Sequence, residues 1–221
     1  MIAIDGPSGS GKGTIAGIIA AKLGFGLLDS GALYRAVGIS AKKYRIKVNN
    51  NKEIVDLISK ININFYSYDG GKVFVDGEDL TTLIRSELGG EMASKVAILP
   101  EVRRALLDKQ LAFRAGPGLV ADGRDMGTVV FPDADLKIFL NASVQERAQR
   151  RYNQLIGKGI DATLPDLFRD LEERDRRDTE RLVSPLKPGK DAVIIDSTDL
   201  TIQEVVDQVL SLFSVVASKS L

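Results

Sequence analysis

A glycine-rich segment near the N-terminus has the composition of an anion-binding loop. It runs from Gly6 to Thr14 as GPSGSGKGT, after the short apolar run Ile2–Ile4 and before a helical pattern of apolar residues. Glycines let backbone N–H groups approach an anion without a clash from Cβ, and a helix N-terminus adds partial positive charge. Lys12 would add a full charge beside a phosphate. The spacing G-x-x-x-x-G-K predicts a phosphate-binding loop. Its residues are Gly6, Pro7, Ser8, Gly9, Ser10, Gly11, Lys12, Gly13 and Thr14.

The residue after the lysine of such a loop is usually Ser or Thr, whose hydroxyl binds Mg²⁺. Here that position is Gly13, and a hydroxyl comes one residue later, at Thr14. We therefore expect ATP and Mg²⁺ at this loop, with Thr14 on the metal side. The alternative is a glycine-rich turn that only joins a strand to a helix, which would not require the further glycines around Lys12.

Polar residues that could hold a phosphate acceptor follow two other apolar runs. Ser30, Tyr34 and Arg35 follow the first of these runs, although Ser30 could serve only as a helix cap. Arg124 follows the second and could form a forked pair of hydrogen bonds with a phosphate. Its alternative partner is Asp125, in a loop salt bridge.

Three arginines share one face of a helix that we expect to begin after Ser143. Arg147, Arg150 and Arg151 lie at i, i+3 and i+4. Three neighbouring cations repel one another unless an anion lies among them, so we expect them to reach the donor phosphates from a mobile lid near Gly157. The alternative is a solvated basic face.

The next helical segment carries charges where its period calls for apolar residues. Leu164, Leu167 and Leu171 form an apolar stripe. At the same spacing the stripe continues into three charged residues, Arg174, Asp178 and Arg181. Residues on such a stripe should point inward, which predicts that these charges face a cleft. The alternative is an exposed ladder of i, i+4 ion pairs.

The elements that must position these residues alternate between strands and helices. Short apolar runs predict five strands, near residues 2–4, 27–28, 118–122, 136–140 and 192–196. Helical patterns follow, including about 86–114, 143–156, 166–182 and 202–213. This alternation favours a three-layer α/β fold with a parallel sheet, in which ligands bind at the carboxyl ends of the strands. Residues 62–80 break the pattern with aromatic and β-branched runs and the pairs Asp69-Gly70 and Asp76-Gly77, which predict a small antiparallel insertion.

Composition excludes several classes of function. The 221 residues contain no cysteine and no histidine, so disulfides, Cys or His metal sites and Ser-His-Asp catalysis are excluded. The formal net charge of zero disfavours binding to a nucleic acid polymer. No apolar run approaches the ~18 residues of a membrane span. The start of the chain leaves no room for a signal peptide, and we expect a cytoplasmic monomer without membrane contact.

The motifs together resemble those of bacterial cytidylate kinase. The resemblance rests on GPSGSGKGT from Gly6, DSGALYR from Asp29, DGRDMGTVVFPDA from Asp122, RDRRD from Arg174 and DST from Asp196. It covers essentially the whole chain, and the segment from Asp122 is its most specific part. The family implies a P-loop NTPase-type fold with a five-stranded parallel sheet, an insertion that binds the nucleoside monophosphate (NMP), and a short lid. It implies a single kinase domain over 1–221, with the core at about 1–34, 116–150 and 166–221, the insertion at about 35–115 and the lid at about 151–165.

The resemblance implies transfer of the γ-phosphoryl group of ATP to CMP or dCMP, with Mg²⁺. By the same resemblance, the acceptor phosphate is held by Arg35, Arg124 and Arg181, and the sugar hydroxyl meets Arg174 and Asp178. Ser94, Arg103 and Asp125 read the base, and Ser30 and Tyr34 complete the acceptor site. We expect Lys12, Arg124, Arg147 and Arg151 to act as catalytic cations, and Arg150 to bind ATP.

Other classes of protein make different demands on the sequence. An adenylate or shikimate kinase shares the phosphate loop but has no need of the segment Asp122–Thr128 or of the β insertion. A nucleotide-dependent switch would bind ATP or GTP without the inward charges on the helix that begins near residue 166. Formation of product from CMP distinguishes these alternatives.

Overall fold

The computed structural model describes residues 1–66, 71–157 and 159–219, and its chain divides into two compact units. The first unit comprises Met1–Leu28 and Phe113–Leu221, and the second comprises Asp29–Ala112. The expected insertion at 35–115 differs from the second unit mainly at its start, because the helix that begins at Ser30 belongs wholly to that unit. The assignment of a core, an insertion and a lid to one kinase domain stays a prediction.

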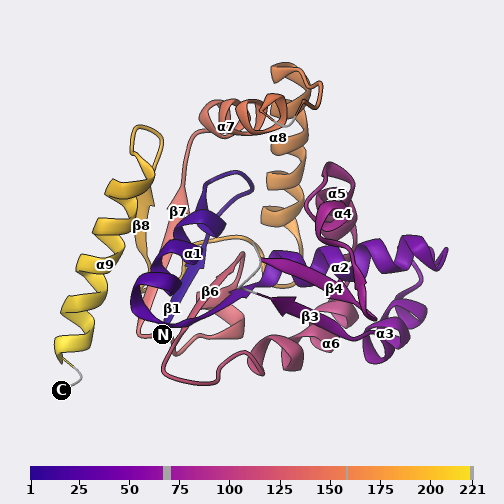
Figure 1. Ribbon diagram of the computed structural model, residues 1–221, viewed down its shortest axis with the longest axis horizontal. Coiled ribbons are helices and arrows are strands. Elements are labelled where there is room, and N and C mark those ends of the chain that lie inside the picture. Colours follow the sequence, from indigo (N-terminus) through magenta and orange to yellow (C-terminus); the bar gives the residue numbers. More distant parts are fainter. Residues whose placement is uncertain (67–70, 158, 220–221) are drawn as a thin grey trace. The chain divides into compact units, whose positions relative to one another are not determined.

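A five-stranded sheet forms the centre of the first unit (Figure 1). Its strands are β1 (Ile2–Asp5), β2 (Gly26–Asp29), β6 (Leu119–Gly123), β7 (Leu136–Asn141) and β8 (Val193–Asp196), in the order β2-β6-β1-β7-β8. β1 pairs in parallel with β6 and with β7, and β7 pairs in parallel with β8. This confirms the predicted sheet. It also explains the apolar runs, because β1 and β6 are buried along their whole length.

Two helices cover one face of this sheet with a continuous apolar core. α1 (Lys12–Leu23) and α9 (Ile202–Lys219) pack there, and α9 is the yellow helix of Figure 1. Ile15 and Ile19 of α1 belong to the same buried cluster as Ile2, Ile4 and several valines of α9. The rings of Phe25 and Phe213 meet edge to face with 5.8 Å between centroids, which fixes the chain after α1 against α9. The phosphate loop is therefore held between a buried strand and a packed helix.

A helical pair extends from the end of β7 (Figure 1, orange). α7 (Val144–Ile156) begins after Ser143, whose hydroxyl accepts a hydrogen bond from the N–H of Glu146 at 3.2 Å. α8 (Leu164–Glu180) is capped in the same way by Thr163. The two helices pack through a small apolar cluster that includes Ala148, Leu155, Leu167 and Leu171. Both N-termini follow from the sequence, since a hydroxyl three residues before an acidic residue favours a helix start.

One element of the first unit was not predicted. After β6 the chain forms η1 (Met126–Val130), a single turn of π-helix in which Phe131 N–H donates to the carbonyl of Met126 at 2.7 Å. Such turns lack a distinctive periodicity in sequence and often occur at functional sites. It follows directly on the segment that carries Arg124 and Asp125.

The second unit combines helices with a small antiparallel sheet (Figure 1). Its elements are α2 (Ser30–Lys43), α3 (Asn51–Lys60), β3 (Ile63–Tyr66), β4 (Lys72–Val75), β5 (Glu78–Asp79), α4 (Thr81–Ile84), α5 (Glu87–Val96) and α6 (Pro100–Leu111). β4 pairs antiparallel with β3 and with β5, as predicted. Asp76 and Gly77 have φ values of 52° and 83°, which is the conformation that an Asp-Gly hairpin turn requires. The other predicted pair, Asp69-Gly70, lies outside the described residues.

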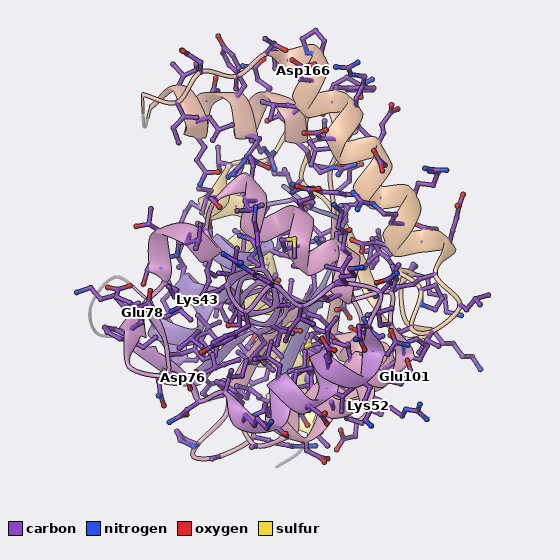
Figure 2. The ribbon with its side chains drawn as sticks, turned by 90° about the vertical axis from the view of Figure 1, so that its right-hand side faces the viewer. Lys43, Lys52, Asp76, Glu78, Glu101 and Asp166 are labelled. Atoms are coloured by element: carbon purple, nitrogen blue, oxygen red, sulfur yellow. The ribbon has the colours of Figure 1, made fainter. Side chains whose placement is uncertain are left out.

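The helical patterns expected at about 86–114 form two helices, α5 and α6. Leu99 has an extended backbone, with φ −83° and ψ 116°, and Pro100 opens α6. A residue before proline avoids the helical conformation, so the helical pattern had to break here. Gly38 of α2 lets α5 approach closely, since a Cβ at that position would lie 2.8 Å from Cβ of Met92. At the surface of this unit Lys43 forms an ion pair with Glu78 (Figure 2).

Candidate active site

The predicted phosphate loop has a backbone that glycine alone fits well. Gly6, Gly9 and Gly11 have φ values of 155°, 79° and 89°. A Cβ at Gly6 would lie 2.1 Å from the carbonyl oxygen of Leu140, a distance that no side chain tolerates. The loop connects the end of β1 to the first turn of α1, where helix N–H groups lack partners within the helix. These features fit a polyphosphate and do not suit a simple connecting turn.

Lys12 is folded onto the loop that precedes it. Its Nζ donates to the carbonyl oxygen of Pro7 at 3.0 Å, and the residue is 8 % exposed. Burial opposes the ionisation of Asp178, but Arg124 above all, then Arg181 and Lys12, favour it, so that the pKa of Asp178 lies below its ordinary value. A buried ammonium held in this way is a fixed charge beside the loop.

A carboxylate that the sequence reasoning left without a role lies beside the first turn of α1. Asp122 is buried at the end of β6, and a Cβ on Gly13 would lie 3.1 Å from its Oδ2. Thr14 is exposed on the same turn. Hydroxyl and carboxylate oxygens are ligands that Mg²⁺ accepts, and Mg²⁺ usually takes only one or two of them together with substrate phosphates. The pair fits such a partial site, and in the described ranges no group of three or more His, Cys, Asp or Glu side chains is placed to hold a metal ion. The position of Asp122, at a strand end next to β1, could have identified it.

Arg147 is buried, and its guanidinium forms hydrogen bonds with three residues of the first unit. Nε donates to the carbonyl of Ala142 at 2.9 Å, Nη1 to the carbonyl of Ser8 at 2.9 Å, and Nη2 to Asp175 Oδ2 at 2.5 Å. Its side chain is 3 % exposed. The alternative of a solvated basic face is therefore wrong for this residue. Arg147 joins the phosphate loop to α8.

Carboxylates of the protein lie among the arginines of α7. Arg150 Nε donates to Glu146 at 2.9 Å, and its Nη2 donates to the carbonyl of Ser197 at 2.5 Å. Arg147 has Asp175. Arg151 is half-buried and donates to Gln154 one turn along the helix. Carboxylates of the protein thus offset the repulsion for Arg147 and Arg150, and their expected contact with the donor phosphates stays a prediction.

The charges predicted to continue the apolar stripe of α8 do point inward. Asp178 and Arg181 are each 8 % exposed, whereas Arg174 is half-buried. Asp178 Oδ2 accepts from Arg124 Nε at 2.8 Å. Burial would lower the pKa of Arg124, but the Asp178 carboxylate more than offsets it, so that this pKa is raised. An exposed ion-pair ladder is excluded for Asp178 and Arg181, and both charges of the Arg124–Asp178 pair persist at neutral pH.

Of the remaining predicted acceptor residues, Asp125 is buried in the first unit, and the others belong to the second unit, where Arg103 and Tyr34 lie together. Arg103 is buried, with its guanidinium carbon 5.5 Å from the centre of the Tyr34 ring, and its Nη1 donates to the carbonyl of Ala97 at 3.2 Å. Arg35 donates to the carbonyl of Ile84 at 3.3 Å. In the described part of the chain, the buried hydroxyl oxygen of Ser94 has no hydrogen-bond partner. A buried hydroxyl without a partner is uncommon and suits a polar ligand atom.

Ser30 is not the cap of α2. Asp29 occupies that position, and its Oδ1 accepts from the N–H of Ala32 at 2.8 Å. Ser30 instead donates through Oγ to Gln110 of α6 at 2.7 Å in a buried contact. Aspartate and serine cap helices about equally well, and the sequence contains both side by side.

Comparison with known proteins identifies the family. The family model described as "Cytidylate kinase" matches residues 2–215. A protein named cytidylate kinase from Pseudomonas aeruginosa (strain UCBPP-PA14) is 52 % identical over 213 residues, which cover 95 % of this chain and 93 % of that one.

The chain belongs to the cytidylate kinase family.

Further relatives of the same name agree with this membership. The cytidylate kinase of Pseudomonas entomophila is 52 % identical over 214 residues, covering 96 % of this chain and 94 % of its own. That of Stutzerimonas stutzeri is 53 % identical over 214 residues, covering 96 % and 93 %. The loop at Gly6–Thr14 and the segment at Asp122–Thr128 both fall within the matched cytidylate kinase family region. No helix within the described residues is long and apolar enough to cross a membrane.

Proposed function

We propose that this chain phosphorylates CMP and dCMP with ATP and forms CDP or dCDP together with ADP. The observation that carries the proposal is the family match over residues 2–215, which includes the phosphate loop and every residue that we assign to the acceptor. We also propose that the chain works as a monomer in the cytoplasm, where both nucleotides are substrates in solution.

The donor side of the proposed reaction uses the loop Gly6–Thr14. Its backbone N–H groups and Lys12 would hold the β- and γ-phosphates of ATP, and Lys12 would exchange the Pro7 carbonyl for a phosphate oxygen. Thr14 and Asp122 would hold Mg²⁺, whose charge offsets that of the phosphate oxygens. Arg150, bonded to Ser197 near the loop, would support the bound ATP.

The acceptor phosphate is assigned to Arg35, Arg124 and Arg181. Arg124 uses Nε for Asp178 and Nη1 for the carbonyl of Gly123, which leaves Nη2 for a phosphate oxygen. Asp178 would accept from the sugar hydroxyl through Oδ1, the oxygen that Arg124 does not use, and Arg174 would donate to the oxygen of the same hydroxyl. The ion pair between Arg124 and Asp178 would therefore fix the distance between the group that binds the phosphate and the group that binds the sugar.

Cytosine recognition is assigned to Asp125, Arg103 and Ser94. A carboxylate accepts from the N4 amine of cytosine, and a guanidinium donates to N3 or O2. Uracil exchanges a donor for an acceptor at these positions, so it would leave buried polar groups unpaired at a cost of roughly 2 kcal/mol or more. The cation–π contact with Tyr34 would keep the Arg103 guanidinium in place.

The reaction needs no general base, because the attacking atom is an ionised phosphate oxygen of CMP. This oxygen forms a bond to the γ-phosphorus while the bond to the β-phosphate oxygen breaks and releases ADP. Alignment of the two nucleotides and fixed positive charge then supply the rate enhancement. Lys12 and Arg124 are the cations that we assign to the transferring group, with Arg151 as an additional candidate.

A panel of nucleoside monophosphates tests the proposal. The purified protein is incubated with Mg-ATP and each of CMP, dCMP, UMP, AMP and GMP, and ADP release is measured. We expect ADP release with CMP and dCMP well above that with the other acceptors. Equal rates with all five, or none above the rate without acceptor, in a protein that circular dichroism shows to be folded, would contradict the assignment.

A further inference from the structure

The last residue of β1 is a buried carboxylate with no role in the scheme above. Asp5 is 5 % exposed and immediately precedes the phosphate loop at Gly6. Its Oδ1 accepts from the N–H of Met126 at 2.7 Å, and its Oδ2 accepts from the N–H of Gly127 at 2.8 Å. Both oxygens are thus committed to backbone donors more than a hundred residues away along the chain.

The sheet register explains how Asp5 reaches these two donors. β1 and β6 run in parallel with Asp5 level with Gly123. The chain leaves β6 at that point, passes through Arg124 and Asp125, and turns into η1 at Met126. Asp5 therefore holds the segment that carries Arg124 and Asp125 at both ends. Its backbone is level with Gly123 before the segment, and its carboxylate binds the N–H groups that follow it.

Asp5 also caps η1, a role that the residue just before a helix usually has. Asp125 is the N-cap residue of η1, but its side chain makes no capping hydrogen bond. The N–H groups of the first turn, at Met126 and Gly127, bond to Asp5 instead. Aspartate is among the best capping residues, so Asp125 would be expected to turn back onto its own helix without this external carboxylate.

Burial of the Asp5 carboxylate costs desolvation free energy, which an apolar side chain at this position would not lose. Burial raises the pKa of Asp5 to about 6, even though the N–H groups of Gly127 and Met126 favour its ionised form. The Asp125 carboxylate raises this pKa further, and the Arg124 guanidinium lowers it. An apolar residue would remove the desolvation cost but would leave two buried N–H groups without acceptors.

We propose that Asp5 is a positioning residue for acceptor recognition, which holds Arg124 and Asp125 in a fixed relation to the phosphate loop. The inference rests on the proposed function, because it takes Arg124 and Asp125 as ligands of the acceptor phosphate and base. Asp5 touches neither nucleotide in this scheme. It acts through the backbone of Met126 and Gly127, and its covalent neighbour Gly6 belongs to the donor loop.

The kinetic test compares Asp5→Asn with the wild-type protein and with Ile4→Val. Asparagine has the same shape but only one acceptor oxygen, so one N–H of the pair would face an amide NH₂ group. We expect the KM for CMP to rise ~10-fold and the preference for CMP over UMP to fall by a similar factor, in line with the loss of one charge-assisted hydrogen bond. The KM for ATP should change by less than about 3-fold.

Ile4→Val is the matched control because it weakens the packing of the same strand one residue earlier. Ile4 is fully buried and lies outside the proposed site. It should lower the melting temperature without changing the ratio of the two KM values. If Asp5→Asn behaves like Ile4→Val, with no selective effect on CMP, Asp5 is only structural and the proposal is overturned.

A second measurement does not depend on activity or on a variant. Amide hydrogen exchange on the wild-type protein without nucleotides should show the N–H groups of Met126 and Gly127 strongly protected. Rapid exchange at both would overturn the proposal. Should Asp5→Asn fail to fold, Asp5→Glu takes its place under the same kinetic criterion, since it keeps the charge and displaces the oxygens by one methylene. If the wild-type protein forms no CDP, the proposed function fails instead, and the exchange result still reports on the Asp5 contact.

Discussion

Asp178 and Arg124 lie 54 residues apart in sequence and form an ion pair, with 2.8 Å between Oδ2 and Nε. The side chains are 12 % and 24 % exposed, so neither charge is fully solvated. The pair joins the chain that leaves β6 to α8. We assign Arg124 to the phosphate of the acceptor and Asp178 to its sugar, so the ion pair would hold the two contacts in a fixed relation.

Asp178→Ala should therefore affect both binding and stability. It leaves the Arg124 guanidinium without its carboxylate, and we expect a loss of about 2 kcal/mol in the free energy of unfolding. The KM for CMP should rise more than the KM for ATP. Asp170→Ala removes an exposed carboxylate from the same helix and serves as the control. Equal effects of the two substitutions in denaturant titrations and steady-state kinetics would contradict this role of the pair.

Arg147 should act by bracing the phosphate loop through its contacts with Ser8 and Asp175. Lysine keeps the charge but cannot make three directed contacts, so we expect Arg147→Lys to lower kcat by ~10-fold or more. Asp175→Asn should lower it through the same contact. If the two act together, the double variant should lose little beyond the larger single loss. Fully additive losses in this cycle would instead indicate that Arg147 acts independently of Asp175, as a ligand of the donor phosphates.

Asp125 should determine the choice between CMP and UMP. Asp125→Ala removes the acceptor assigned to the N4 amine, and we expect the ratio of kcat/KM for CMP over UMP to fall by ~10-fold or more. Asp133→Ala removes an exposed carboxylate that pairs with Arg114 in the same unit, and it is the control. An unchanged ratio in Asp125→Ala would show that another residue reads the base.

Asp5 should give stability a measurable dependence on pH. Burial raises the pKa of Asp5 to about 6 from its ordinary value of 3.8, so the folded state binds this proton more tightly than the unfolded state does. Its contribution to stability is complete well below pH 3.8 and is lost as the pH rises through 6. Relative to Asp5→Asn, which cannot ionise, the wild-type protein should lose roughly 2 kcal/mol in free energy of unfolding between pH 4 and pH 7. Parallel curves for the two proteins in denaturant titrations would contradict a buried, titrating Asp5.

Local rules were sufficient for much of this structure. The five strands, the loop at Gly6–Thr14 and the caps at Ser143 and Thr163 depend on neighbouring residues and on short periods. The inward position of Asp178 and Arg181 also follows from periodicity, because a charge on an apolar stripe must be buried with its helix. These features could be predicted since each is encoded within about one turn or one strand.

Features that depend on distant partners could not be predicted in the same way. The burial of Arg147 requires Asp175 on another helix, and the role of Asp5 requires a register between β1 and β6. η1 has no periodicity of its own. The break at Pro100 and the cap at Asp29 are within reach of local rules, because a residue before proline avoids the helical conformation and aspartate caps a helix as well as serine does.

Transfer of a labelled phosphoryl group tests the central claim most directly. The wild-type protein and Lys12→Met are incubated with CMP, Mg²⁺ and ATP labelled at the γ-phosphorus, and labelled CDP is measured. The wild-type protein should form labelled CDP and ADP in equal amounts, and folded Lys12→Met should do so ~10³-fold more slowly because it lacks the fixed charge on the transferring group. A folded wild-type protein that forms no labelled CDP, or a Lys12→Met variant with normal turnover, would contradict the account.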